Sequence, residues 1–127
     1  MNLIKSVGID IVDVERIKGI EKRWSYKGLL KIYTERELDL CKNQKGYNWN
    51  SLAGRYAMKE AVIKTFIEWA AEVSLKDIEV LKGYNGEPKI ILHGQAKKIA
   101  NNLSISTFHG SISHDAGIAG AMVIAEK

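Results

Sequence analysis

The sequence predicts an α+β fold in a single domain spanning residues 1–127, with a mainly antiparallel sheet packed against one long helix and shorter helices. Three observations predict it. The length of 127 residues allows one domain. Strand-like and helix-like segments alternate with short connections, and no linker, repeat or low-complexity tract interrupts them. Because 46% of the residues are hydrophobic, the chain can build a core without disulfides, and the lone Cys41 is expected to be a buried, inert thiol.

The first strand is expected over residues 7–14, where apolar residues lie on both sides of Asp10. Such a run suits a strand that is buried on both faces, which would place an ionisable carboxyl group among apolar groups. An unpaired buried carboxylate is costly, so two interpretations are open: Asp10 accepts backbone N–H bonds at the strand end, or it binds a cation. Asp13 follows the strand pattern and is expected to cap the next helix, which begins near Arg16.

A second helix is expected after Thr34, because Thr34 and Glu37 have the spacing of a capping box. The third and longest helix is predicted over residues 51–70, with an apolar side for the core. Alanines at positions 53, 57 and 61 give it a stripe of small residues that allows close packing.

The long helix carries charged groups at helical spacing. Glu60 and Lys64 lie one turn apart on one face, and Arg55 and Lys59 form an adjacent pair at the same spacing. Taken alone, this pattern favours a solvated helix face, on which an acid-before-base pair contributes only about 0.2–0.5 kcal/mol. Chemistry on a phosphate also needs such groups.

The second half of the chain predicts a β-hairpin followed by a helix and two strands. The turn pair Asn85-Gly86 suits the positive φ angles of a hairpin, and Pro88 is expected to begin the returning strand. The expected segments are strands over residues 77–82 and 89–92, a short helix over 95–103, and strands over 110–113 and 118–125.

Residues 16–31 concentrate positive charge. They hold six lysines and arginines against Glu21 alone, whereas the whole chain has a net charge of only +4. If helical, the segment puts Arg16, Ile20, Arg23 and Lys27 on one side, which mixes basic and apolar groups. A surface that binds nucleic acid more often combines basic side chains with exposed aromatics or amides. A surface that binds an acidic protein helix needs both positive charge and apolar contact. A merely soluble basic face remains an alternative.

Two motifs together resemble a known family. Gly8-Ile9-Asp10 followed by Arg16, then Arg55-Tyr56-Ala57-x-Lys59-Glu60-Ala61-x-x-Lys64, is similar to the pattern of the 4′-phosphopantetheinyl transferase superfamily. The small holo-[acyl-carrier-protein] synthase branch is the nearer match, since the larger branch joins two such halves in one chain and usually has an acidic residue where this chain has Val12. The similarity continues through residues 31–38, Asn85-Gly86-x-Pro88 and Ser111-Ile112-Ser113-His114-Asp115, so it covers nearly the whole chain in order.

The resemblance implies that the chain transfers 4′-phosphopantetheine from coenzyme A to a serine of an acyl carrier protein and releases adenosine 3′,5′-bisphosphate. It implies a homotrimer with active sites at the subunit boundaries. Asp10 and Glu60 would bind one Mg²⁺, and Lys64 would stabilise or protonate the departing phosphate; Glu60 and a metal-bound water are both open as the base for the serine proton. The carrier protein would dock on Arg16, Ile20 and Arg23, and coenzyme A would contact Arg55, Lys59, Gly86, Pro88 and His114.

One segment departs from the family pattern. Family members usually carry a glycine-rich stretch after the long helix, and this chain has residues 66–74 there without a glycine. The helix is therefore expected to continue, with Trp69 packed on the core or on a neighbouring subunit. Trp24 and Trp49 are expected to be packing residues.

Two other function classes are alternatives: a catalytically silent subunit that binds carrier protein, and a basic module that binds nucleic acid. Asp10 inside an apolar strand argues against the nucleic-acid module, and the retained Asp10, Glu60 and Lys64 argue against a silent subunit. Residues 1–6 run into the first strand without a signal-peptide layout, and no apolar run reaches membrane-spanning length. The cytoplasm is therefore the expected compartment, with no membrane and no nucleic acid among the partners.

Overall fold

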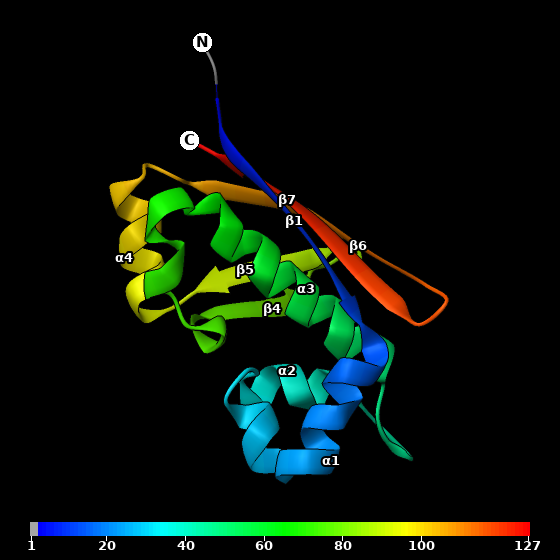
Figure 1. Cartoon of the computed structure of the whole chain (residues 1–127). Helices are drawn as coiled ribbons and strands as arrows, with labels where there is room; N and C mark the ends of the chain where they lie inside the picture. Colours follow the sequence, from blue (N-terminus) through cyan, green and yellow to red (C-terminus); the bar gives the residue numbers. More distant parts are fainter. Residues whose placement is uncertain (1–2) are drawn as a thin grey trace.

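The central unit of the fold is an antiparallel three-stranded sheet with one long helix across it. The computed structural model describes residues 3–127. Met1 and Asn2 lie outside the described residues; they begin the segment that is predicted to lack a signal-peptide layout. The strands run in the order β1 (Ile4–Asp13), β7 (Ile118–Glu126) and β6 (Thr107–Asp115). Helix α3 (Trp49–Thr65) packs on one face of this sheet (Figure 1), which confirms the predicted α+β class.

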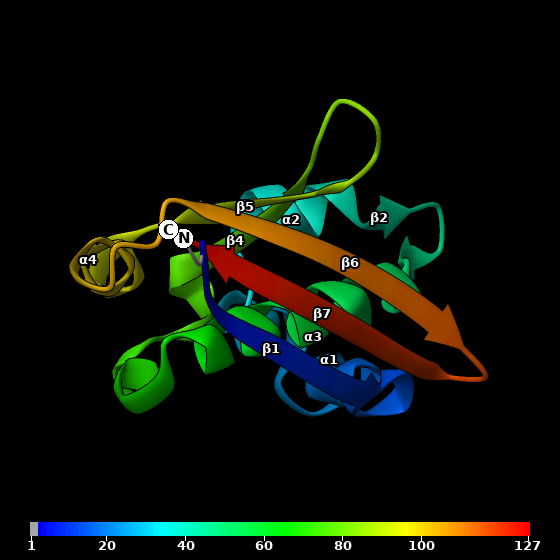
Figure 2. The same ribbon diagram turned by 90° about the horizontal axis from the view of Figure 1, so that it is seen from above.

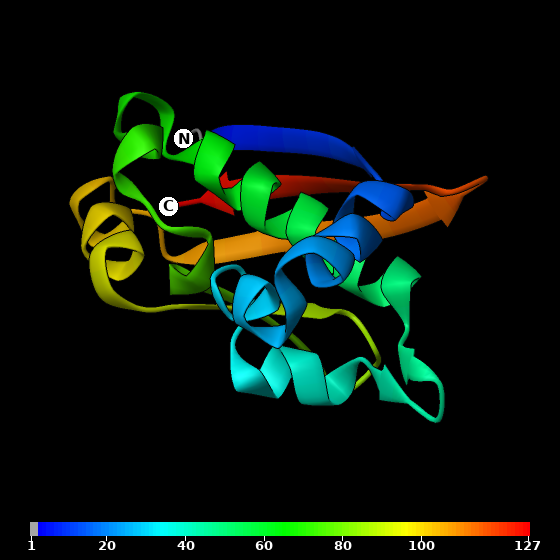
Figure 3. The ribbon, with the colours of Figure 1, turned by 60° about the horizontal axis from the view of Figure 1, so that its bottom comes forward.

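Shorter elements surround this unit. Helices α1 (Val14–Leu30) and α2 (Glu35–Leu40) gather at one end of the molecule, as Figures 1 and 3 show. Within residues 3–127, none of the helices has the length and apolarity that crossing a membrane requires. The remaining elements are β2 (Lys42–Asn43), β3 (Gly46–Tyr47), the 3-10 segments η1 (Ile67–Glu72) and η2 (Leu75–Asp77), the hairpin of β4 (Ile78–Lys82) and β5 (Pro88–Leu92), and α4 (Gly94–Asn102).

Small residues bring α3 close to β1. Ala53, Ala57 and Ala61 are fully buried, as their spacing predicted. On β1, Gly8 lies so near α3 that a Cβ atom at this position would collide with the carbonyl oxygen of Ala61. Gly8 and the alanine stripe therefore set the short distance between the strand that carries Asp10 and the helix that carries Glu60.

The prediction that β1 is buried on both faces is wrong for the single chain. Successive residues of a strand point to opposite faces. Ser6, Gly8, Asp10 and Val12 point toward α3, and the Ser6 hydroxyl donates to the Thr65 carbonyl oxygen at 2.7 Å. Val7, Ile9 and Ile11 point away from it and are 62%, 67% and 69% exposed. They lie beside Ile118 and Met122 of β7, which are also exposed. In the described part of the chain no helix covers this outer face of the sheet (Figure 2).

The predicted helix starts are confirmed. The Asp13 side chain accepts a hydrogen bond from the Glu15 N–H at 2.9 Å and so caps α1, which begins at Val14, two residues before Arg16. Thr34 and Glu37 form both bonds of the capping box of α2. Within α1, Ser25 has φ 59° and ψ −159°, which divides residues 14–30 into two helical pieces.

The predicted end of the long helix is wrong. Helix α3 stops at Thr65 and not at residue 70, because Ile67 adopts a left-handed backbone conformation (φ 57°) and a 3-10 segment follows. Trp69 consequently stands partly exposed. Trp24 is 64% exposed, which also contradicts its predicted packing role. Trp49 does pack, edge to face, on Tyr47.

The hairpin and the C-terminal strands agree with the prediction. Gly86 has φ 85°, and Pro88 begins β5, although the connection spans residues 83–87 and is longer than a two-residue turn. Strands β6 and β7 are each longer than expected. Cys41 is buried, as predicted, and burial raises the pKa of its thiol.

Candidate active site

One candidate site lies where β1 meets α3, and we call Asp10, Glu60 and Lys64 the acid site. The Lys64 ammonium lies 3.2 Å from Asp10 Oδ1 and donates a hydrogen bond to the Ile9 carbonyl oxygen at 2.8 Å. The side chains of Lys64 and Asp10 are 52% and 18% exposed. Asp10 is thus partly accessible and paired with a cation that solvent also reaches.

Tyr56 precedes Glu60 by one turn of α3 and contacts Arg16 of α1. Burial raises the pKa of the Tyr56 hydroxyl, and the negative charges of Glu60 and Asp10 raise it further, while Arg16 lowers it. Arg16 Nη2 donates to the Tyr56 hydroxyl at 3.4 Å, and its guanidinium lies over the Tyr56 ring. Arg16, which α1 supplies, therefore lies beside the Tyr56 hydroxyl, and the charges of Asp10 and Glu60 also act on the pKa of this group.

The donor set of the acid site fits Mg²⁺. Asp10 and Glu60 offer hard carboxylate oxygens, and Mg²⁺ in proteins is often held by one or two carboxylates together with waters and substrate phosphates. Among residues 3–127 no group of three or more His, Cys, Asp and Glu side chains is arranged to hold a metal ion. Mg²⁺ commonly completes its octahedral shell with waters and substrate phosphates.

A pocket of about 600 Å³ lies between α3, the β4–β5 hairpin and β6. Four of the five residues predicted to contact coenzyme A line it: Arg55, Gly86, Pro88 and His114. Gly54 makes this arrangement possible, because a Cβ atom there would press on the side chains of Ile112 and His114. Asp10, Glu60 and Lys64 are not among the described residues that line the pocket.

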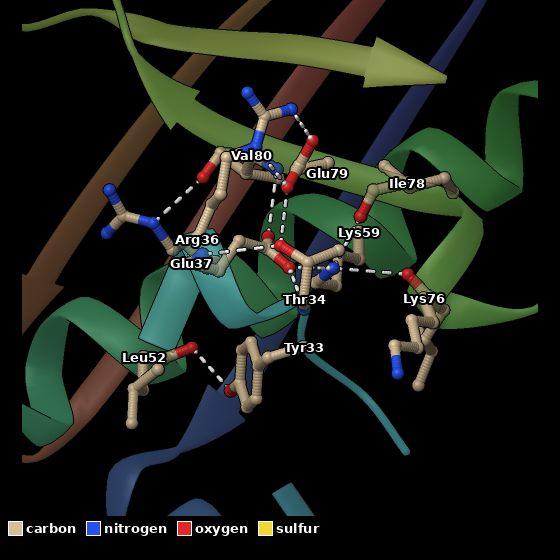
Figure 4. A network of polar contacts seen from close by, with 12 residues as sticks. Tyr33, Thr34, Arg36, Glu37, Leu52, Lys59, Lys76, Ile78, Glu79 and Val80 are labelled. Carbon is tan, nitrogen blue, oxygen red and sulfur yellow. Dashed lines mark hydrogen bonds and ion pairs between the residues drawn. The ribbon is translucent and has the colours of Figure 1, made fainter. Parts of the chain in front are cut away.

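The fifth residue, Lys59, is not in the pocket, which corrects the prediction that it binds a coenzyme phosphate. Its side chain is fully buried. The ammonium donates to Glu37 Oε1 at 2.7 Å, to the Leu75 carbonyl at 3.1 Å and to the Ile78 carbonyl (Figure 4). All three N–H groups are therefore used within the protein. Burial lowers the pKa of Lys59, and the Glu37 carboxylate opposes that shift.

The sequence analysis did not predict that two buried acids, Glu37 and Glu79, belong to a polar network. We call Glu37, Lys59 and Glu79 the buried cluster. Glu79 accepts hydrogen bonds from Arg36 and Thr34, each at 2.5 Å, and lies 3.0 Å from His93 Nε2. Burial raises the pKa of the Glu79 carboxyl group, but these bonds outweigh it and lower the pKa to about 2. The capping-box spacing showed Glu37 only as a helix cap, and Glu79 gave no signal in its strand.

The predicted docking residues differ in exposure. Arg16 and Arg23 are exposed on α1, whereas Ile20 is half-buried and packs against the core. Of the histidines without a motif, His93 contacts Glu79, and His109 is exposed and 3.5 Å from Glu126.

Comparison with known proteins gives one consistent family. The family model described as the 4′-phosphopantetheinyl transferase superfamily matches residues 6–119. A holo-[acyl-carrier-protein] synthase from Caldicellulosiruptor saccharolyticus is 42% identical over 125 residues, which is 98% of both chains.

Solved structures agree with this family. The Helicobacter pylori holo-[acyl-carrier-protein] synthase in complex with coenzyme A has a TM-score of 0.79 at 35% identity, covering 94% of this chain and 98% of that chain. The Neisseria meningitidis holo-[acyl-carrier-protein] synthase has a TM-score of 0.81 at 31% identity, covering 98% of this chain and 100% of that chain. The fold expected from the two motifs is therefore confirmed.

Proposed function

This chain belongs to the 4′-phosphopantetheinyl transferase superfamily, and from that premise we propose that it is the transferase that converts apo acyl carrier protein to its holo form. A serine hydroxyl of the carrier attacks the β-phosphorus of coenzyme A. A serine–phosphorus bond forms, and adenosine 3′,5′-bisphosphate leaves. The pocket lined by Arg55 and His114, beside the helix that carries Glu60, is the observation that carries this proposal. The structure of the Helicobacter pylori relative is a complex with coenzyme A, which supports the proposal.

The acid site supplies the chemistry in this proposal. Asp10 and Glu60 would hold one Mg²⁺, which when bound neutralises charge on the phosphate oxygens during transfer. The Lys64 ammonium lies 3.2 Å from Asp10 and would stabilise or protonate the departing phosphate. Glu60 is also the candidate base for the serine proton.

We further propose a homotrimer whose active sites lie between subunits. Arg55 and Glu60 are five residues apart, which separates them by about 140° around the helix axis, so the pocket and the acid site open on different sides of α3. The exposed apolar side chains of Val7, Ile9 and Ile11 offer a surface that a second copy can cover. A neighbouring copy could then bring its pocket to this acid site. Light scattering should give about three times the mass of one chain under assay conditions.

The carrier protein would dock on α1. The exposed guanidiniums of Arg16 and Arg23 suit an acidic helix, and Ile20 between them offers apolar contact although it is partly packed on the core. Residues 1–127 would form one transferase domain. The cytoplasm stays the predicted compartment.

Intact-mass spectrometry tests the proposed function. Apo acyl carrier protein is incubated with the protein, coenzyme A and Mg²⁺, beside an EDTA control and a Glu60→Ala control. A gain of one phosphopantetheinyl group only in the complete mixture is the expected result. No gain with several carriers, from a folded protein that still binds the carrier, would instead identify a catalytically silent carrier-binding subunit.

A further inference from the structure

The buried ion pair between Glu37 and Lys59 has no part in the function proposed above. Both side chains are fully buried. Removing two charges from water is expensive, and apolar residues of similar volume often replace such a pair without loss of stability. Stability alone therefore does not explain why this ion pair is buried here. Its contacts with β4 suggest a different role for the pair.

Strand β4 has one edge without a strand partner among the described residues. β5 pairs with its other edge, and the N–H and C=O groups of one residue in an antiparallel strand point to the same side. Buried backbone groups need partners. Charged side chains supply them here: Lys59 donates to the Ile78 carbonyl, Glu37 Oε2 accepts the Val80 N–H at 2.8 Å, and Arg55 Nε donates to the Val80 carbonyl at 2.9 Å.

Val80 thus joins the buried pair to the coenzyme pocket. Its N–H is held by Glu37 and its carbonyl by Arg55, and both Val80 and Arg55 line the pocket. Because the guanidinium is a rigid planar fork, fixing Nε on the Val80 carbonyl also fixes the direction of the two terminal nitrogens. The position of the Arg55 guanidinium, and therefore its contact with a bound anion, depends on the position of β4.

We propose that Glu37 and Lys59 are positioning residues, which fix the free edge of β4 so that Arg55 presents its guanidinium to the phosphates of coenzyme A. Neither residue touches the coenzyme. Figure 4 shows Glu37 turned toward Lys59 and Val80, in the interior of the network. This inference rests on the proposed function, because it takes the pocket to be the coenzyme site.

The test is binding of coenzyme A, measured by titration calorimetry in EDTA without carrier protein, so that neither metal nor turnover contributes. The variant Glu37→Asp keeps the charge and retracts the carboxylate by one methylene from Val80. Its dissociation constant should rise about tenfold, the size expected for losing one hydrogen bond to a charged group. In the transfer assay the KM for coenzyme A should rise by a similar factor while kcat stays within about twofold. Glu35→Gln, an exposed change on the same helix, is the matched control and should bind like the wild type.

A double-mutant cycle separates positioning from a general loss of structure. In an Arg55→Lys background, which lacks the Nε contact with Val80, Glu37→Asp should weaken binding by less than about twofold. If Glu37→Asp does not fold, the double variant Glu37→Leu with Lys59→Met removes both charges together and carries the same expectations.

Three results decide between the two proposals. Wild-type affinity in Glu37→Asp, or an undiminished effect of that change in the Arg55→Lys background, would overturn this inference and leave the proposed function intact. Failure of the wild-type protein to bind coenzyme A both in EDTA and in the presence of Mg²⁺ would overturn the assignment of the pocket, and this inference with it.

Discussion

The acid site and the buried cluster are two charged regions that share helix α3, and adjacent residues belong to different regions. Lys59 is fully buried, and Glu37 and two backbone carbonyls use all of its N–H groups. Glu60, the next residue, is half-buried, and its charge raises the pKa of Tyr56. In the acid site, Lys64 is half exposed and binds Asp10 in contact with solvent.

The difference separates charges that hold the fold from charges that are available to a ligand. In the buried cluster every polar side-chain atom without solvent access has a hydrogen-bond partner within the described residues. A group satisfied in this way gains nothing from a ligand and loses its bonds if it moves. In the acid site, solvent reaches the carboxylate and the ammonium, so a metal ion or phosphate can replace water there at lower cost. Removing a charge should therefore reduce stability in one region and activity in the other.

The largest expected effect is on the stability of the buried cluster. Lys59→Met leaves the Glu37 carboxylate buried without its cation, so the free energy of unfolding should fall by about 3–5 kcal/mol. Urea unfolding followed by circular dichroism measures it. Lys64→Met, five residues along the same helix, is the matched control and should change stability by less than about 0.5 kcal/mol. Equal losses in both variants would show that the two regions do not differ in this way.

The second prediction concerns activity alone. Glu60→Gln keeps the shape of the side chain and removes the charge, so turnover should fall at least about a hundredfold, equivalent to about 3 kcal/mol of lost transition-state stabilisation. Its unfolding curve should overlay that of the wild type. The measurement is the rate of holo-carrier formation at saturating coenzyme A. A fully active Glu60→Gln protein would contradict the assignment of the acid site.

The sequence predicts the acid site better than the buried cluster, and the reason is physical. Asp10 and Glu60 occur in short motifs, and an acid within an apolar strand is a local anomaly that needs no knowledge of the fold. The partners of Lys59 come from α2 and from β4, so its burial depends on how three separate elements pack. Helical spacing placed Lys59 beside Arg55 but did not show which of the two would reach the pocket.

Other errors have the same origin. The alternation of residues in β1 was visible in the sequence. Whether Val7, Ile9 and Ile11 are covered depends on what packs on the outer face of the sheet, and no helix of the described residues packs there. The end of α3 depends on the left-handed conformation of Ile67, and isoleucine is a poor indicator of that conformation. Turn and cap positions were predicted correctly because their signals, such as Thr34 with Glu37, are local.

The third prediction alters the distance between the two halves of the acid site. Gly8→Ala places a methyl group against the Ala61 carbonyl, so β1 must move away from α3. Unfolding free energy should fall by about 1–3 kcal/mol, as for other overpacked sites. Turnover should fall as well, because Asp10 moves relative to Glu60.

Gly19→Ala is the control for this change, since a Cβ atom there meets nothing within 4 Å. It lies in α1 and should stabilise the protein by about 0.5–1 kcal/mol through helix propensity. Thermal unfolding of both variants, together with the rate of carrier modification, measures the two effects. Unchanged activity in Gly8→Ala would show that the spacing between β1 and α3 does not control the acid site.

The smallest expected effect is the pH dependence of the buried cluster. The pKa of Glu79 is lowered from 4.5 to about 2 in the folded protein, because the hydrogen bonds from Arg36, Thr34 and His93 outweigh the effect of burial. A depressed pKa gives stability that is fully present above the unfolded-state value and lost as pH falls through the folded-state value. The wild type should therefore exceed Glu79→Gln by about 1 kcal/mol at neutral pH, and the difference should shrink between pH 4.5 and 2.

Urea unfolding at a series of pH values measures this difference, with the exposed change Glu68→Gln as the control for loss of a carboxylate on the surface. The control should differ from the wild type by less than about 0.5 kcal/mol at every pH. A gap between wild type and Glu79→Gln that persists unchanged at pH 2 would mean that the charge of Glu79 is not what holds β4 to Arg36 and Thr34. The buried cluster would then act through packing alone, and its contrast with the acid site would rest on Lys59 and Glu37.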